Sequence, residues 1–453
     1  MTSGTTTGTA TAEFSAQLLA AAASPLPPEA ARASRRTLFN VLGTAIGAAR
    51  TPAVDSLFAA ARRRGAVGAA VVPGRPESTN SYWSALITGT AAHHDDYDDT
   101  HLATVIHPGA SALATVLSLQ ADAETSGERF LIAFALGCEA QLRIGNAISP
   151  SHYERGWHIT GTCGVFGSTV AAALLLGLDV ETTERALGLA ATMTLGHREG
   201  FGSMTKPFHP GKAAANGVHA ARLAASGATS VPDPLGDGGA LEVLATAVDR
   251  LELGGSEWEL TKNTFKPYPC GIVAHPVIDA AVEAARQVPD PTQITAVSIS
   301  CHPLVPELMG RRQPTDGLQA RFSAYHAAAA GLLDGEVGLP QFTDARVRAV
   351  DTTRLRDLIT LQPSGERARD EATVRVEQAN AQPVIVWVEH ARGSLARPLT
   401  DQELFTKVDR LVEPVLGIGA AQRVADAVDQ LATTPGPNEL LAAIHPNEES
   451  THD

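Results

Sequence analysis

Cysteine is scarce in this sequence, and its placement excludes two kinds of site. The four cysteines, Cys138, Cys163, Cys270 and Cys301, are scattered over 453 residues without a CxxC or other short metal-ligand spacing. Neither a disulfide framework nor a zinc site is therefore predicted, and we expect a reducing compartment.

An excess of positive charge is missing too. The chain has 35 Lys and Arg against 49 Asp and Glu, a net charge of −14. This balance argues against nucleic acid or an anionic membrane surface as a partner. If the ligand is an anion, its site must be a local basic focus within an acidic body.

Long uninterrupted apolar runs are not apparent, so no membrane-spanning segment is predicted. The first 13 residues are rich in Thr, Gly and Ala and do not resemble a signal peptide. We expect a cytoplasmic protein that begins with a disordered tail over residues 1–13.

The pattern of the remaining chain predicts a mostly α fold. Ala- and Leu-rich segments with apolar residues at helical spacing fill the part before Lys266, and helical pattern returns at Thr400, which forms a capping box with Glu403. β-branched runs of strand length occur only between Lys266 and Arg397: Ile294–Ser300, Ala372–Glu377 and Pro383–Glu389. We predict a large all-helical domain built from both chain ends, residues 1–265 and 400–453, with an inserted α+β lid domain, residues 266–399.

Residues 93–107, HHDDYDDTHLATVIH, collect costly groups between two helical segments. The carboxylates are Asp95, Asp96, Asp98 and Asp99, and the imidazoles are His93, His94, His101 and His107. Pro108 suits the first position of a helix, so His107 is expected beside a helix N-terminus, where anions are favoured. A solvated acidic loop is the alternative interpretation.

Three further loops carry similar chemistry. His158 lies in GWHITG ahead of a helix over residues 164–176, Lys206 and His209 lie in a Gly-rich loop ahead of a helix opened by Pro210, and Lys266 lies in a Pro-rich turn leading to another helix. Each alone has an ordinary explanation, a core histidine or a surface lysine. Four such loops together predict an anion-binding pocket at helix N-termini.

Six segments in this order carry a resemblance to a known family: AAHHDDYDDTHLATVIHPGAS, GWHITGTCGVFGSTVAAALLLGLD, TKPFHPGKAAANGVHAARLAASG, KPYPCGIVAH, ARFSAYHAAAAGLLDG and RGSLARPLTDQEL. From about Leu18 to beyond Leu411, the chain resembles the MmgE/PrpD family of 2-methylcitrate dehydratases, cis-aconitate decarboxylases and iminodisuccinate epimerases. The resemblance implies a helical domain with an α+β lid, a cleft between them, a homodimer and no cofactor.

The resemblance also marks site residues. It implies the active-site positions Asp96, Thr100, His107, His158, Lys206 and Lys266. We expect Thr100 and Lys266, together with His209 of the third loop, to bind the substrate. The family often has Tyr where this chain has His326, and Tyr325 precedes it, so either side chain is a candidate for substrate binding. The 2-methylcitrate dehydratases carry a Trp in the HPG stretch that VIHPGAS lacks, which argues against that substrate.

The chemistry implied is proton movement next to a carboxylate. We expect a lyase acting on a small di- or tricarboxylate, a dehydratase or decarboxylase, with Asp96, His107, His158 and Lys206 as catalytic residues; an epimerase with the same residues is the second interpretation. A third comes from Asp95, Asp96 and Asp99, which fit the DDxxD magnesium motif of terpenoid synthases. No second metal motif follows and aromatics are only 5%, so no metal is predicted.

Overall fold

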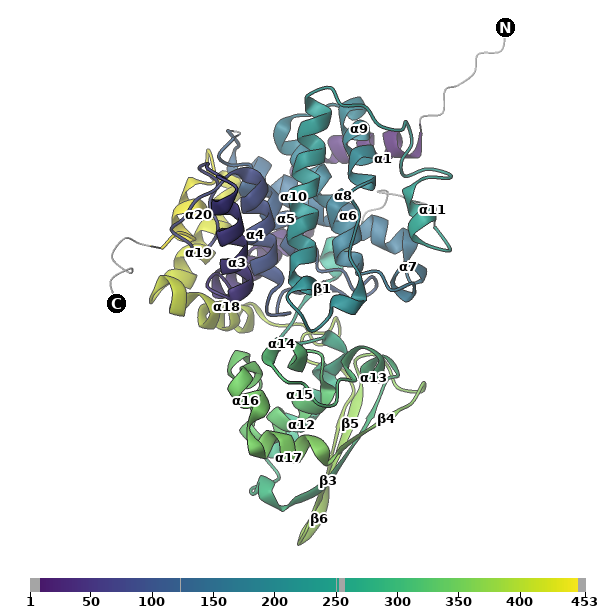
Figure 1. Ribbon diagram of the computed structural model, residues 1–453, viewed down its shortest axis with the longest axis vertical. Coiled ribbons are helices and arrows are strands. Elements are labelled where there is room, and N and C mark those ends of the chain that lie inside the picture. Colours follow the sequence, from purple (N-terminus) through teal and green to yellow (C-terminus); the bar gives the residue numbers. More distant parts are fainter. Residues whose placement is uncertain (1–8, 123, 250, 252–256, 447–453) are drawn as a thin grey trace.

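The computed structural model describes residues 9–122, 124–249, 251 and 257–446. The fold is mostly α, as predicted: a large helical domain is built from both ends of the chain, and a smaller α+β lid is inserted between them (Figure 1). The first part of the helical domain contains α1 (Ala10–Ala22), α2 (Pro28–Gly47), α3 (Pro52–Arg63), α4 (Ser81–His93), α5 (Pro108–Ser118), α6 (Gly127–Ile148), α7 (Ser151–Glu154), α8 (Ile159–Leu176), α9 (Val180–Ala191), α10 (Thr205–Ala225) and α11 (Ala240–Leu244).

Helix α1 corrects the predicted tail. Residues 1–8 lie outside the described residues, but the prediction of disorder is wrong for residues 9–13, because α1 already begins at Ala10. The Thr9 hydroxyl accepts a hydrogen bond from the Ala12 amide at 3.1 Å, and the Thr11 hydroxyl donates to Asp233 at 2.6 Å. The partner of Thr11 is 222 residues away, so local composition could not reveal it.

Helices α4 and α10 cross at two glycines, and this crossing positions the site. A Cβ added to Gly89 would lie 2.6 Å from the Cα of Gly211, so the backbones meet without intervening side chains. The last residue of α4, His93, is thereby brought close to Lys206 in the first turn of α10.

Two core helices contradict the expectation that no segment could span a bilayer. Helices α6 and α8 are long and apolar enough by length and composition, but 89% and 94% of their most apolar windows are buried inside the helical domain. Their apolar composition is that of helices surrounded by protein on all sides.

A short ladder corrects the prediction that strands occur only after Lys266. Strands β1 (Asp99–His101) and β2 (Asn263–Phe265) pair antiparallel, with Asp99 opposite Phe265. Three-residue strands with polar composition carry no periodic signal, and their pairing spans more than 160 residues. The ladder ties the acidic loop to the segment that carries Lys266.

The lid packs helices against one mixed sheet. Its helices are α12 (His275–Ala285), α13 (Leu304–Met309), α14 (Gly317–Ala320), α15 (Ala324–Asp334), α16 (Asp344–Arg348) and α17 (Val350–Asp357). Its strands, in the order β4-β3-β5-β6, are β4 (Ile359–Pro363), β3 (Ile294–Cys301), β5 (Ala372–Gln378) and β6 (Ala381–Val388). Only the β3–β4 pair is parallel. Three strands match the predicted runs, whereas β4 was not predicted.

The C-terminal helices return to the helical domain, as Figure 1 shows. These are α18 (Asp401–Leu416), α19 (Ala420–Gln430) and α20 (Asn438–Ala443). The predicted capping box of Thr400 and Glu403 opens α18. Helix α18 packs on α2, where a Cβ on Gly43 would lie 2.8 Å from Val408.

Candidate active site

A small cavity of about 50 Å³ lies where the lid meets the helical domain, and we call it the inner pocket. Six of the predicted residues line it: Asp96, Thr100, His107, His158, Lys206 and Lys266. All six are buried, with at most 7% of their surface exposed. Four loops that are far apart in the sequence therefore converge on one site.

Asp96 holds the two lysines together. Its Oδ1 accepts from Lys206 Nζ at 2.5 Å and pairs with Lys266 Nζ at 2.9 Å, and its backbone carbonyl also accepts from Lys266 at 3.1 Å. Burial raises the pKa of the Asp96 carboxyl, but the two ammonium groups outweigh burial and hold it well below its ordinary value. Asp96 is thus an anion that orients two cations.

The backbone at Asp96 is left-handed, with φ +50°. Asp and Asn tolerate this conformation better than other residues with a side chain. The turn directs Oδ1 toward the lysines and leaves Oδ2 buried without a hydrogen-bond partner among the described residues.

His93 is central to the site, although the sequence prediction counted it only as part of the acidic cluster. Its Nδ1 lies 2.6 Å from Asp98, and its Nε2 lies 2.8 Å from Lys206 Nζ. An ammonium group can only donate, so His93 Nε2 accepts and Nδ1 carries the proton that is donated to Asp98. Because burial lowers the pKa of His93, the ring is a neutral connector that fixes the position of Lys206.

His107 presents a lone pair to the pocket. Its Nδ1 lies 2.7 Å from the Asp99 carbonyl oxygen, which can only accept, so Nδ1 carries the proton. The Thr100 hydroxyl lies 3.1 Å from the same nitrogen. Burial lowers the pKa of His107 well below its ordinary value, so the ring is neutral and Nε2 is unprotonated. This is the geometry of a general base.

His158 is paired with His209. The two Nδ1 atoms lie 2.8 Å apart, and His158 Nε2 is buried without a partner among the described residues. Burial lowers the pKa of both rings, that of His209 to about 4. When the Nδ1 of His209 donates, His158 Nε2 carries a proton toward the pocket; when the bond is reversed, Nε2 presents a lone pair. His158 can therefore act as an acid or a base.

The predicted helix N-termini need three corrections. His107 and His158 are the residues directly before α5 and α8, but α8 begins at Ile159, and α10 begins at Thr205 so that Pro210 lies inside the helix. Lys266 follows strand β2 and is not at a helix end. Its position comes from the β1–β2 ladder.

Aromatic side chains close the pocket on the lid side. Phe322 of the lid and Phe201 of the helical domain have ring centroids 5.3 Å apart, and Lys206 Nζ lies 5.4 Å from the Phe201 ring. The phenyl rings place apolar surface beside the Lys206 ammonium group, and a less polar surrounding strengthens electrostatic interactions.

Tyr325 and His326 do not line this pocket, so their prediction as substrate-binding residues is not supported. His326 is fully buried within the lid, where its Nε2 bonds to the Gln341 carbonyl at 2.8 Å, and Tyr325 packs beneath Arg312. Both belong to α15, whose start at Ala324 turns these side chains into the lid core. The segment reaches the site through Phe322, and through Arg321, which pairs with Asp95 at 2.9 Å.

Comparison with known proteins decides the family. The profile of the MmgE/PrpD N-terminal domain matches residues 12–247, and that of the MmgE/PrpD C-terminal domain matches residues 268–433. The chain belongs to the MmgE/PrpD family. The two matches together span the helical domain and the lid, and the second extends into α18 and α19, which pack on the helical domain.

Curated relatives of this MmgE/PrpD protein carry one recurring name. It is 28% identical over 398 residues to a cis-aconitate decarboxylase-like protein of Aspergillus oryzae, covering 80% of this chain and 82% of the relative. It is 27% identical over 349 residues to the cis-aconitate decarboxylase of Mus musculus, covering 73% and 71%, and 29% identical over 297 residues to that of Homo sapiens, covering 62% and 61%.

Family membership removes the terpenoid-synthase interpretation, and the geometry explains why the DDxxD match misleads. Asp95 faces Arg321, Asp96 faces the two lysines, and Asp99 accepts from the Gly109 amide at 3.0 Å. The three carboxylates point to separate partners and do not converge on one metal position.

Among the described residues, two groups have a spacing that suits a cation, and both contain His93. Potential ligand atoms lie within 4.8 Å of one another in His93, His107 and His158, and likewise in His93, Asp96 and Asp98. However, both nitrogens of His93 already have partners, and one partner is the Lys206 ammonium group, which would repel a metal ion. We keep the prediction that activity needs no metal.

Proposed function

We propose that this protein is a cofactor-independent lyase that removes a carboxyl group, as CO2, from a small unsaturated tricarboxylate of the cis-aconitate type. The observation that carries the proposal is the pair of buried ammonium groups, Lys206 and Lys266, facing two neutral imidazoles in a pocket between the two domains. The names of the relatives favour decarboxylation over dehydration.

The proposed reaction needs one acid and two anchors. Lys206 and Lys266 bind carboxylates of the substrate. The carboxylate on the methylene carbon leaves as CO2, the electron pair of that C–C bond forms a new double bond, and the old double bond takes a proton at its far carbon. We assign the acid to His158 Nε2, which His209 can reprotonate from the edge of the pocket.

An epimerase of a dicarboxylate such as iminodisuccinate is the second candidate. The observation that favours it is the presence of two neutral imidazoles in one pocket, because His107 presents an unprotonated Nε2 that can remove a proton, and His158 can carry a proton on Nε2 and return it. Such a reaction breaks no bond to carbon other than C–H.

Incubation with cis-aconitate, citrate, methylcitrate and iminodisuccinate in deuterated water, followed by NMR, separates these functions. We expect cis-aconitate alone to lose a carboxyl group and the product to carry one deuterium. Exchange of deuterium into iminodisuccinate without loss of carbon would favour the epimerase, and no change in any of the acids would refute the lyase proposal.

We also propose that the protein is a homodimer. Size-exclusion chromatography with light scattering measures its mass in solution, and the mass of a single chain would contradict this proposal.

A further inference from the structure

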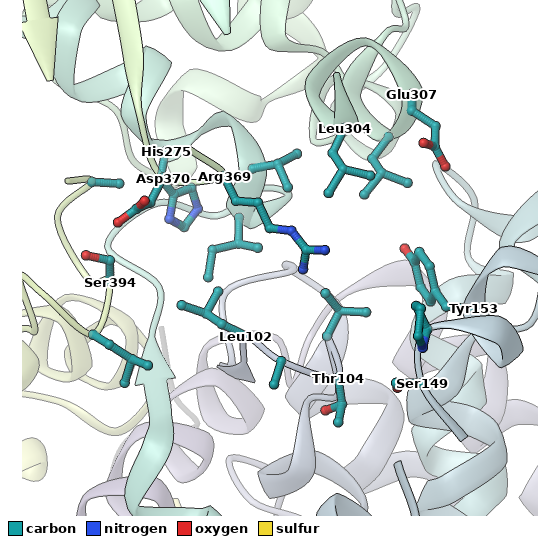
Figure 2. Close-up of a pocket in the computed structure, with 18 of the residues that line it drawn as sticks. Leu102, Thr104, Ser149, Tyr153, His275, Leu304, Glu307, Arg369, Asp370 and Ser394 are labelled. Carbon is teal, nitrogen blue, oxygen red and sulfur yellow. The ribbon is translucent and has the colours of Figure 1, made fainter. Parts of the chain in front are cut away.

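A larger cavity of about 500 Å³ adjoins the inner pocket, and we call it the outer cavity. The lid and the helical domain both contribute to its wall, as Figure 2 shows. The two cavities share five lining residues: Val105, Tyr153, Ile272, Val273 and Leu308. A ligand that reaches the inner pocket from this side therefore passes through the outer cavity.

Most charged side chains around the outer cavity have partners. Arg198 pairs with Glu307 at 3.1 Å, and Asp370 pairs with His390 at 2.9 Å. Arg369 and Glu154 differ, because neither side chain has a hydrogen bond or ion pair to any residue that the structure describes, and Arg369 is the cation of the two. Figure 2 shows its guanidinium group extending from the lid into the cavity.

The shared wall offers one polar group of its own. Tyr153 lines both cavities, and its hydroxyl makes no hydrogen bond to a described residue. In Figure 2 the Tyr153 side chain lies at the helical-domain side of the cavity, opposite the lid that carries Arg369. The cavity wall thus offers a cation from the lid and a hydroxyl donor from the helical domain.

Size and charge indicate the occupant. The inner pocket, at about 50 Å³, has room for only a few water molecules, whereas a six-carbon tricarboxylate has 12 non-hydrogen atoms. The protein as a whole carries a net charge of −14, which repels a trianion approaching from solvent. An unpaired arginine at the mouth supplies the local attraction that such a substrate requires.

We propose that the outer cavity is an antechamber in which Arg369 binds one carboxylate of the substrate, with the Tyr153 hydroxyl as the second donor, while the reacting part enters the inner pocket. This assignment rests on the proposed tricarboxylate lyase function. The planar guanidinium group matches the two oxygens of a carboxylate, which an ammonium group does not.

The kinetic test compares Arg369→Gln, Arg369→Lys and the control Arg348→Gln. Arg348 is an exposed lid arginine beside Asp344 that does not line the cavity, so its variant removes the same charge from the lid. Loss of a charged hydrogen bond predicts that Arg369→Gln lowers kcat/KM about 10-fold to 100-fold, mainly through KM, and flattens its dependence on salt. Arg369→Lys should keep the salt dependence, and Arg348→Gln should lie within about twofold of wild type.

A binding measurement separates this site from the proposed function. Propane-1,2,3-tricarboxylate lacks the double bond, and its binding is measured by calorimetry in wild type and Arg369→Gln. If wild type turns over substrate but Arg369→Gln has the same kcat/KM as Arg348→Gln, the antechamber proposal is wrong and the lyase proposal stands. The same holds if Arg369→Gln lowers kcat alone. No turnover of any acid, with propane-1,2,3-tricarboxylate still bound in an Arg369-dependent manner, overturns the lyase and supports the site. No binding in wild type overturns the site.

Discussion

Asp96→Asn isolates the charge that holds the two lysines. Lys206 and Lys266 lie 2.5 and 2.9 Å from one carboxylate oxygen, so their ammonium groups are within about 5.5 Å of each other. Asn keeps the size of the side chain and tolerates the left-handed backbone, with φ +50°, about as well as Asp does. The substitution therefore removes the negative charge and leaves the backbone unstrained.

The cost can be bounded in two ways. Two unit charges about 5 Å apart repel by about 3 kcal/mol at an effective dielectric constant of about 20. Alternatively Lys206, whose ordinary pKa is 10.5, loses its proton at pH 7 at a cost of about 5 kcal/mol. We expect Asp96→Asn to lower the free energy of unfolding by about 3–5 kcal/mol, the usual result of breaking a buried ion pair.

Thermal unfolding by circular dichroism at pH 7 measures this loss, which corresponds to roughly 3–5 °C in melting temperature for a chain of this length that unfolds as one unit. Asp401→Asn is the control, because Asp401 pairs with Arg36 at 3.0 Å while its side chain is 68% exposed, and its loss should cost under about 1 kcal/mol. If Asp96→Asn has the same melting temperature as Asp401→Asn, the two lysines do not depend on Asp96 for their charge.

The pH dependence gives the sign of the effect. Burial lowers the pKa of Lys206 in the folded protein, and removing Asp96 lowers it further. Between this lowered pKa and the ordinary value of 10.5, Lys206 is protonated in the unfolded chain and unprotonated in the folded one. The unfolded chain therefore binds more protons over this range. Stability of Asp96→Asn therefore rises with pH from 7 toward 10, and its deficit against wild type narrows. A deficit that stays constant over this range would contradict the assignment of the cost to buried ammonium groups.

Four further outcomes are expected. His158→Gln should lower turnover by roughly two to four orders of magnitude with little change in melting temperature, since Gln can still bond to His209; early melting with turnover retained would identify a packing residue. Lys206→Met should raise KM markedly in steady-state kinetics, because the ammonium group binds the anion in both ground and transition states. Arg321→Gln should raise the rate of amide hydrogen exchange at the contact between lid and helical domain, since it breaks the 2.9 Å pair with Asp95. Unchanged exchange would show that this ion pair does not hold the lid on the helical domain. EDTA should leave turnover unchanged, and loss restored by magnesium would refute the metal-free prediction.

The residues of the site were predictable because they are expensive to bury. Asp96, His107, His158, Lys206 and Lys266 are charged or polar groups in Gly- or Pro-shaped loops beside apolar helices, and the family resemblance supported each position. The lid strands β3, β5 and β6 were equally visible, since β-branched residues recur along them.

The remaining features depend on contacts between distant segments. The β1–β2 ladder has three residues in each strand, and only the fold shows that it delivers Lys266 to Asp96. The Gly89–Gly211 crossing, which sets the distance from His93 to Lys206, is likewise a property of two helices that are far apart in sequence. Tyr325 and His326 were expected to face the substrate, but they lie in the first turn of α15, whereas Phe322 of the loop before this helix lines the pocket. A difference of a few residues in the start of a helix cannot be read from the sequence.

The charge balance of the inner pocket connects binding with catalysis. Asp96 and Asp98 offset Lys206 and Lys266, so a substrate carboxylate brings negative charge that the pocket has not neutralised. The histidine next to it, His158, has a pKa held low by burial and by nearby positive groups. An anion placed beside this ring counteracts the nearby positive groups and raises its pKa, so in the proposed reaction we expect substrate binding to favour the protonated form of His158. We therefore expect the acid of the proposed reaction to form with substrate in place. The proposed role of Arg369 at the mouth of the pocket is consistent with this, because a cation there would assist binding without occupying the position where the proton is required.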